Sequence, residues 1–395
     1  MKQYPLGLKG ICALALCLSL TVPALAVEEA EKEPLESVGW AELEDRIRSG
    51  SPTALSVSEN IASIESLDYE KMYEELREQL NDIAKAQWMM VQMGQSGTLA
   101  YEQMDQGYDA LRDTFEAIKD GDLQEDNADL VWQIGDAANQ IVAAGERLYL
   151  TLLELEQSAA DGARGLAALD RTLEEMRLRQ SLGQISRQTL EELEQKRSDT
   201  ASQLQTLNHT IATYKGQLQS LMGEEPTGIL TLEGLPQEGP LEELPDYEEA
   251  LTAAKGASWS LYSAELTIDD ARDDWYGRSG GIHNYKYQMA EHTWKAAEFT
   301  YQSTVQEFET AFRTCYDAVG DCEQILENKT RAAEYQQRLM ERAQAKYDLG
   351  LISRSALLSA QDELAAAQSA VEGARRDLFA AQNNLRLAIR YGLVK

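Results

Sequence analysis

Apolar residues recur at alternating three- and four-residue steps through a long stretch of the second half of the chain. Lys329 and Gln336 are the only interruptions. This period is typical of a helix that packs one side against a partner helix, and it predicts a helix of roughly 52 residues. The apolar positions are Val305, Phe308, Phe312, Cys315, Val319, Cys322, Leu326, Ala333, Met340, Ala343 and Tyr347.

A second heptad pattern follows, over about 37 residues, with one large and one small core position in each repeat. Its large positions are Leu357, Leu364, Val371, Leu378 and Leu385. Its small positions, three residues after each large one, are Ala360, Ala367, Ala374, Ala381 and Ala388. A small residue at every second core position lets two helix axes approach closely. We therefore expect this Ala row to be a close-packed seam.

The motif Leu-Gly-x-Ile-Ser-Arg lies between the two patterns and occurs twice in the chain. It begins at Leu182 and again at Leu349, so the offset in residue number is 349 − 182 = 167. At the same offset, the first half carries a matching heptad pattern on both sides of the motif, although its return helix lacks the Ala row. The repeat predicts two tandem antiparallel helical hairpins, each with a short turn at the motif.

The prolines divide the chain between these two halves. Pro226, Pro236, Pro240 and Pro245 lie close together in the sequence, whereas 53–225 and 246–395 contain no proline. These stretches are rich in helix-forming residues. We expect a first hairpin repeat over 27–222, a Pro- and Gly-rich linker over 223–245, and a second repeat over 246–395. The predicted fold is all-α with little or no β structure, the one candidate strand being Ile229 to Leu232.

Residues 1–26 are typical of an export signal. Lys2 and Lys9 precede or flank an apolar run that ends in the small-residue site Ala24-Leu25-Ala26. The apolar run is too short for a transmembrane anchor, and Cys17 lacks the preceding small residues of a lipidation site. We expect Sec-dependent export and a role outside the cytoplasm, without a lipid anchor or transmembrane helix.

Charge and composition argue against several classes of function. The formal net charge of −31 opposes binding to nucleic acid, because phosphate contacts supply most of that affinity. His209, His283 and His292 have no partner residues at metal-ligand spacing. Cys315 and Cys322 would lie about 10.5 Å apart on one helix, beyond disulfide reach. No phosphate-binding loop, nucleophile elbow or zinc-protease motif is present. We expect no catalytic residue, cofactor or metal.

The two turns carry the strongest candidate for a binding surface. Each motif places apolar side chains and a positive charge at the end of a hairpin in an acidic protein, a combination that suggests partner docking. Its glycine suits the positive φ that closes a helix and its serine can cap the next helix, so the alternative is a turn with no further role. The residues are Leu182, Gly183, Ile185, Ser186 and Arg187, and Leu349, Gly350, Leu351, Ile352, Ser353 and Arg354.

The export signal, the duplicated long-helix halves and the return helix from Tyr347 to Gly392 together resemble the TolC-like outer-membrane efflux protein family. Leu244 to Trp275 is similar to the helix that opens the family's second repeat, and Gly39 to Ser66 to a degenerate copy that opens the first. The resemblance implies a trimer whose hairpins form a twelve-helix tube in the cell envelope. It also implies an exit duct of efflux pumps or type I secretion systems, whose tips meet a periplasmic adaptor and an inner-membrane transporter.

The chain departs from the family pattern in two places. In the family, each repeat inserts a pair of strands that helps to close a membrane barrel. Neither Tyr276 to Thr293 nor Met93 to Asp129 predicts such strands, the latter reading as polar helix. We therefore expect a relative without these strands, for which insertion in the outer membrane does not follow. Many relatives carry an acidic residue near the tip where this chain has Thr189 and Ala356, so an acidic gate is not expected.

Three functions remain open from the sequence. The favoured one is a duct component of a multipart efflux or secretion system, and the alternative is an extracytoplasmic structural or adaptor coiled coil without transport activity. An exported enzyme is the third. Because long, thin hairpins expose more apolar seam than one subunit can cover, we expect a closed homo-oligomer, most simply a trimer.

Overall fold

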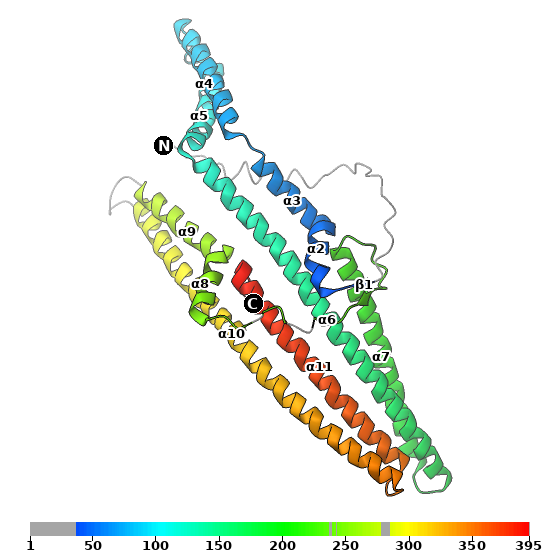
Figure 1. The fold of residues 1–395 in the computed structure, drawn as a ribbon. Helices are drawn as coiled ribbons and strands as arrows, with labels where there is room; N and C mark the ends of the chain where they lie inside the picture. Colours follow the sequence, from blue (N-terminus) through cyan, green and yellow to red (C-terminus); the bar gives the residue numbers. More distant parts are fainter. Residues whose placement is uncertain (1–36, 237–238, 242, 278–284, 395) are drawn as a thin grey trace. The chain divides into compact units, whose positions relative to one another are not determined.

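The computed structural model describes residues 37–236, 239–241, 243–277 and 285–394. The predicted export signal, residues 1–26, and His283 lie outside these ranges. The described residues form ten helices and two short strands, which confirms the all-α prediction (Figure 1). The elements are β1 (Ser37–Val38), α2 (Trp40–Gly50), α3 (Pro52–Glu65), α4 (Tyr69–Gln92), α5 (Leu99–Asp120), α6 (Asp122–Ser181), α7 (Arg187–Leu221), β2 (Thr231–Leu232), α8 (Tyr247–Ala257), α9 (Trp259–Tyr276), α10 (Tyr285–Asp348) and α11 (Arg354–Tyr391).

Two long antiparallel hairpins, α6–α7 and α10–α11, carry the duplicated heptad patterns. Helices α6 and α10 have 60 and 64 residues and are longer than the apolar pattern alone predicts. Their added turns lie before the heptad seam, where α6 packs against α3 and α5 and α10 packs against α9. Tertiary packing therefore extends both helices beyond their most periodic segment.

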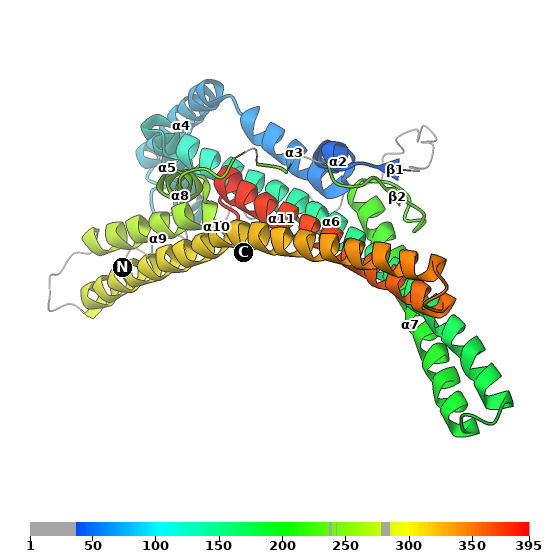
Figure 2. The same cartoon turned by 60° about the horizontal axis from the view of Figure 1, so that its bottom comes forward.

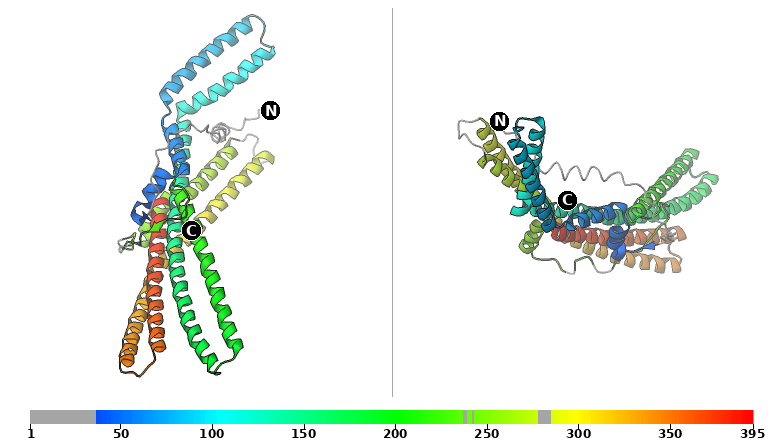
Figure 3. Two further views of the ribbon diagram at one scale, coloured as in Figure 1. Left: turned by 90° about the vertical axis from the view of Figure 1, so that its right-hand side faces the viewer. Right: turned by 90° about the horizontal axis from the view of Figure 1, so that it is seen from above.

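The four long helices follow one another in the contact order α7, α6, α11 and α10. Helix α6 contacts α7 on one side and α11 on the other, and α11 contacts α10 (Figures 2 and 3). Within the described residues no extensive contact joins α7 to α10. The row of four helices thus has two outer members.

A pair of short helices opens each half in the same way. Helices α2 and α8 have 11 residues each and are followed by the buried serines Ser51 and Ser258, at an offset in residue number of 258 − 51 = 207. In each half, the junction between the two short helices packs closely against a glycine with positive φ that follows the return helix. A Cβ added to Gly223 would lie 1.9 Å from the carbonyl oxygen of Gly50, and one added to Gly392 would lie 2.3 Å from Ser258 Cα. Only glycine fits such an approach.

The first half contains an additional hairpin, α4–α5. The opening helices of the two halves are 207 residues apart in the sequence, whereas the turns of the long hairpins are 167 residues apart. The segment from the opening helices to the turn is therefore longer in the first half, by the difference between these two offsets. The α4–α5 hairpin lies between the equivalent positions and accounts for this added length. The segment from Met93 to Asp129, predicted as polar helix, forms α5 and the start of α6.

Strand structure in the described residues is limited to one small parallel pair. Ser37 aligns with Thr231 and Val38 with Leu232, so β2 covers only the second part of the predicted strand. This pair fastens the linker to the chain before α2. None of the helices described combines the length and apolar composition that crossing a membrane requires.

Candidate functional site

The two Leu-Gly-x-Ile-Ser-Arg turns have the same backbone geometry. Gly183 and Gly350 have φ angles of +71° and +70°. The N–H groups of Gly183 and Gly350 donate to the carbonyl oxygens of Gln180 and Tyr347 at 2.9 and 2.8 Å, respectively. The backbone N–H of the residue after each glycine donates to the carbonyl of the residue just before Gln180 or Tyr347. This second bond completes a Schellman motif. Both helices therefore end with their last carbonyl groups hydrogen-bonded.

A serine then starts each return helix. Ser186 Oγ accepts the backbone N–H of Thr189, and Ser353 Oγ accepts that of Ala356, both at 3.1 Å. Both caps use the backbone N–H of the third residue after the serine. At the first turn Thr189 Oγ1 also lies 2.9 Å from Ser186 Oγ, a contact that Ala356 cannot make. The turns thus have the local geometry that glycine and serine predict, and a docking role is a separate hypothesis.

The apolar side chains of the turns divide into exposed and half-buried groups. Leu182, Leu349 and Leu351 are 64%, 74% and 69% exposed, whereas Ile185 and Ile352 are half-buried. Arg187 and Arg354 are also exposed, and Arg187 Nε lies 2.8 Å from Glu191 Oε1. Each tip therefore presents leucine and arginine side chains to solvent.

The Ala row of α11 becomes more buried toward the end of the chain. Ala360 and Ala367 are half-buried, whereas Ala374, Ala381 and Ala388 are buried. Ala381 and Ala388 belong to a core cluster that also contains residues of α8, α9 and α10. The last part of the row therefore packs within the subunit.

A buried carboxylate joins the first half to the second. Glu146 of α6 is 3% exposed and accepts hydrogen bonds from Asn383 Nδ2 at 2.8 Å and Arg386 Nη2 at 2.6 Å, both on α11. Sequence reasoning missed this group, since its partners lie in the other half of the chain. The sequence offers one weak sign, polar Asn383 between the core positions Ala381 and Leu385.

The same network continues to α2 through a second carboxylate. Glu44 accepts from Tyr391 Oη at 3.1 Å and pairs with Arg48 at 2.9 Å. Burial works to raise the pKa of Glu44, but the hydrogen bond and charge of Arg48 hold that pKa below its ordinary value. The network fixes the positions of α2, α6 and α11 relative to one another.

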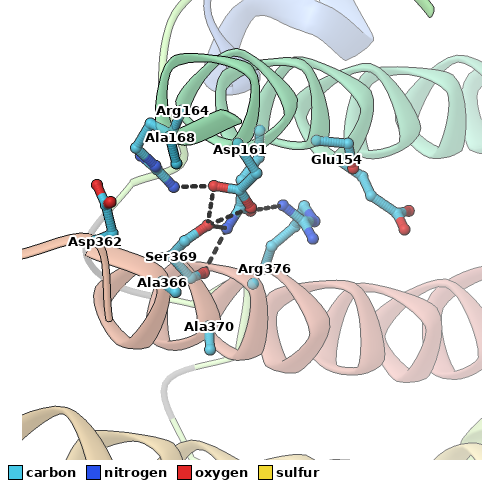
Figure 4. A pocket seen from close by; sticks show the side chains of 13 residues that line it. Glu154, Asp161, Arg164, Ala168, Asp362, Ala366, Ser369, Ala370 and Arg376 are labelled. Atoms are coloured by element: carbon cyan, nitrogen blue, oxygen red, sulfur yellow. Dashed lines mark hydrogen bonds and ion pairs between the residues drawn. The ribbon is translucent and has the colours of Figure 1, made fainter. Parts of the chain in front are cut away.

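A polar groove of about 490 Å³ lies between α6 and α11, further toward the tips (Figure 4). Asp161 accepts from Ser369 Oγ at 2.7 Å and pairs with Arg164, while Gln157 bonds to both Ser369 and Arg376. Ser369 is therefore held by a carboxylate, and the described residues that line the groove include no histidine. Among the described residues, no group of three His, Cys, Asp or Glu side chains could hold a metal ion.

The fold is similar to that of solved bacterial outer-membrane channels. The outer membrane protein VceC of Vibrio cholerae has 13% identity and a TM-score of 0.50, with 89% of this chain and 96% of that chain covered. The open MtrE outer membrane channel of Neisseria gonorrhoeae has 16% identity and a TM-score of 0.50, with 89% and 88% covered. The CmeC outer membrane channel of Campylobacter jejuni has 14% identity and a TM-score of 0.50, with 72% and 68% covered.

Comparison of sequences alone finds no relative. No family model matches the chain, and no curated protein sequence matches it. At 13–16% identity, the solved structures establish the fold, which is the helical fold that the duplicated pattern predicts.

Proposed function

We propose that the chain is one subunit of a helical duct in a multipart efflux or type I secretion system of the cell envelope. The observation that carries the proposal is the row of four long helices with outer members α7 and α10. A row of this kind closes into a tube when α7 of one subunit packs against α10 of the next. Closed symmetry then covers both edges without open-ended assembly.

The side chains of the outer helices support this packing. Along α10, Ile325 and Tyr335 are 46% and 55% exposed. Along α7, the residues that are buried lie near its end, from Ile211 onward, so most of its heptad pattern lacks a second neighbour. Apolar groups repeated along an exposed helix favour a partner helix. The fold similarity to outer-membrane channels supports a tube and a role in transport.

The mass in solution tests this assembly. Light scattering of the chain without its predicted export signal is expected to give three times the subunit mass. A monomer at micromolar concentration in detergent-free buffer would contradict the duct. It would favour the second candidate function, an extracytoplasmic structural or adaptor coiled coil.

The tips are the proposed contact for a periplasmic adaptor, which would connect the duct to an inner-membrane transporter. The exposed leucines and arginines of the two turns offer an apolar surface with positive charge in an acidic chain. We expect the pair Leu351→Ser and Arg354→Glu to abolish crosslinking to a co-expressed adaptor. Helix content and oligomer mass are expected to stay unchanged.

A matched pair away from both the turns and the outer helices provides the control. Ile229→Ser in the linker and Arg375→Glu on α11 remove one exposed apolar side chain and reverse one exposed arginine. Crosslinking is expected to survive in this variant if its oligomer mass is unchanged. Persistent crosslinking in the tip variant would show that the motifs are turns with no docking role.

A further inference from the structure

The end of the α4–α5 hairpin differs from the ends of the two long hairpins in its lack of charge. From Ala86 to Tyr101 the chain has no Asp, Glu, Lys or Arg, although charged residues make up 26% of the sequence. The uncharged run across the first Leu-Gly-x-Ile-Ser-Arg turn covers only 180–186, and that across the second only 349–353. We call residues 86–101 the uncharged tip.

Large apolar side chains are exposed on more than one side of the uncharged tip. Trp88, Met89 and Val91 are 62%, 55% and 49% exposed on α4, while Met93 and Leu99 are 64% and 70% exposed at the turn. On a helix, neighbouring positions point about 100° apart, so residues 88, 89 and 91 together span about 160° of the surface of α4. The inner stripe of α4 contains buried Leu80 and half-buried Met90; Val91 falls close to this stripe, whereas Trp88 and Met89 lie outside it.

The rest of the hairpin has the ordinary pattern of a water-exposed helix pair. Before Lys85 in the sequence, most exposed positions of α4 are charged, and Tyr73 stacks on Phe115 of α5 between the helices. A helix that is apolar on every side is suited to a fully apolar environment, whereas one that is apolar on one side is suited to a partner helix. The change from one pattern to the other occurs within one turn, at Lys85.

The backbone of the uncharged tip closes in the same way as the two Leu-Gly-x-Ile-Ser-Arg turns. Gly94, with φ +72°, donates to the carbonyl of Val91 at 3.0 Å, and Gln95 donates to that of Met90 at 2.9 Å. Thr98 Oγ donates to the Gln95 carbonyl at 2.8 Å and accepts the N–H of Tyr101 at 3.3 Å. These bonds pair groups that would otherwise be costly to remove from water.

We propose that the uncharged tip docks end-on into the interfacial layer of a lipid bilayer. A bilayer surrounds an inserted tip and can cover exposed apolar side chains that face more than one direction, whereas a protein groove covers one side. Trp and Tyr suit the boundary between headgroups and acyl chains. The α5 side is uncharged for about one helical turn, or roughly 6 Å, so insertion is shallow.

The charges that follow the uncharged tip indicate which lipid surface it fits. The charged residues nearest to the uncharged tip on the two helices have a net charge of −2. They are Asp82 and Lys85 on α4, and Glu102 and Asp105 on α5. They would be at headgroup level in the docked state, where they oppose anionic lipid and suit zwitterionic headgroups. Binding is therefore expected to be apolar in origin and not to increase with anionic lipid or low salt.

Vesicle binding tests the proposal without requiring an oligomer, an adaptor or transport. The chain without its export signal is mixed with phosphatidylcholine vesicles, with and without phosphatidylglycerol, and sedimented. We expect binding to phosphatidylcholine that is not strengthened by the anionic lipid. The combination Trp88→Asn, Met93→Gln and Leu99→Gln should weaken binding about tenfold or more, because it removes three exposed apolar contacts. The matched control, Leu182→Ser, Leu349→Ser and Leu351→Ser, should bind as the parent chain does.

A fluorescence measurement keeps the test decisive if the triple variant does not fold. Trp88 is one of six tryptophans, and Trp88→Phe is a mild change at an exposed position. Brominated phosphatidylcholine should quench part of the emission of the parent chain and less of that of Trp88→Phe. Absence of vesicle binding, or equal quenching in the two proteins, would overturn the proposal. A triple variant that binds lipid normally but loses oligomer mass would show that the uncharged tip contacts another copy instead.

Discussion

The two halves of the chain build the same helix crossing with the large and small side chains exchanged. In the first half, Ile47 of α2 covers Gly145 of α6, and a Cβ added to Gly145 would lie 2.2 Å from Ile47 Cδ1. In the second half, the position equivalent to Ile47 is Ala254 of α8, which lies 207 residues later, as do the other residues of the opening helices. The position equivalent to Gly145 is Phe312 of α10, which lies 167 residues later, as do the other residues of the long hairpin. Both lie in one buried cluster. The large residue has moved from the short helix to the long one.

This exchange shows what the duplicated fold requires at the crossing. The space between the helices must be filled, because protein interiors are close-packed, but either helix can supply the volume. A heptad pattern identifies the positions that face inward and does not specify which partner is large. The first half and the second half therefore share their backbone arrangement and differ in the side chains that stabilise it.

Truncation of Phe312 is expected to have the largest effect on stability. Phe312→Ala should lower the free energy of unfolding by about 3–5 kcal/mol, because Ala254 opposite is too small to fill the cavity. Unfolding in urea measures the change. Phe299→Ala on the same helix is the control, since Phe299 is exposed and its truncation should cost no more than about 0.5 kcal/mol.

A second substitution sharpens this prediction. Adding Ala254→Ile to Phe312→Ala recreates the first-half arrangement, with the large residue on the short helix, and should restore part of the lost stability. If Ala254→Ile gives no recovery, or lowers stability further, the exchange of volume between the halves is not what fills the crossing.

The buried polar groups also differ between the halves. Arg386 pairs with buried Glu146. Its equivalent in the first half is Gln219, which lies 167 residues earlier in the sequence, the same separation as between the two turns. Gln219 is itself buried and holds the linker, donating to Thr227 Oγ at 2.9 Å and accepting from the Gly228 N–H at 2.9 Å. The same structural position thus serves two different contacts.

Exchanging the second-half residue for its first-half equivalent should be strongly destabilising. Arg386→Gln leaves Glu146 buried without its charged partner, and we expect a loss of about 3 kcal/mol in the free energy of unfolding. Arg375→Gln is the control, because Arg375 pairs with Glu372 on the surface and such pairs contribute about 1 kcal/mol or less. Equal losses in the two variants would show that Glu146 is not dependent on Arg386.

Sequence patterns predicted the elements of this fold better than their contacts. Turn chemistry at Gly183 and Gly350 has a local cause, and the backbone there has the expected conformation. The pairing of Glu146 with Arg386 has no local cause, since it depends on how two hairpins lie together. The apolar surface of the uncharged tip escaped notice for a related reason. The periodicity that predicts a helix comes from its inner stripe, while Trp88 and Met89 lie outside that stripe.

The Ala row of α11 is a further place where the two halves differ in side-chain size, and we expect a smaller effect on stability there. Ala374 is 4% exposed, and its first-half equivalent is Leu207. Ala374→Leu should overpack α11 and cost about 1–3 kcal/mol, since the surrounding helices have closed around alanine. Gln368→Leu, at an exposed position of the same helix, should cost much less. Identical melting temperatures for the parent chain and Ala374→Leu would show that the row is not closely packed.

The turns provide the comparison in which the halves should behave alike. A Cβ added to Gly183 or Gly350 would meet nothing within 4 Å, so alanine at either position is opposed only by the positive φ. Gly183→Ala and Gly350→Ala should each cost about 1 kcal/mol by urea unfolding, and the two costs should agree. Gly135→Ala, in the interior of α6 with equally open space, should instead be stabilising, because alanine is the better helix former. Unequal costs at the two turns would mean that one of them makes a contact the other lacks.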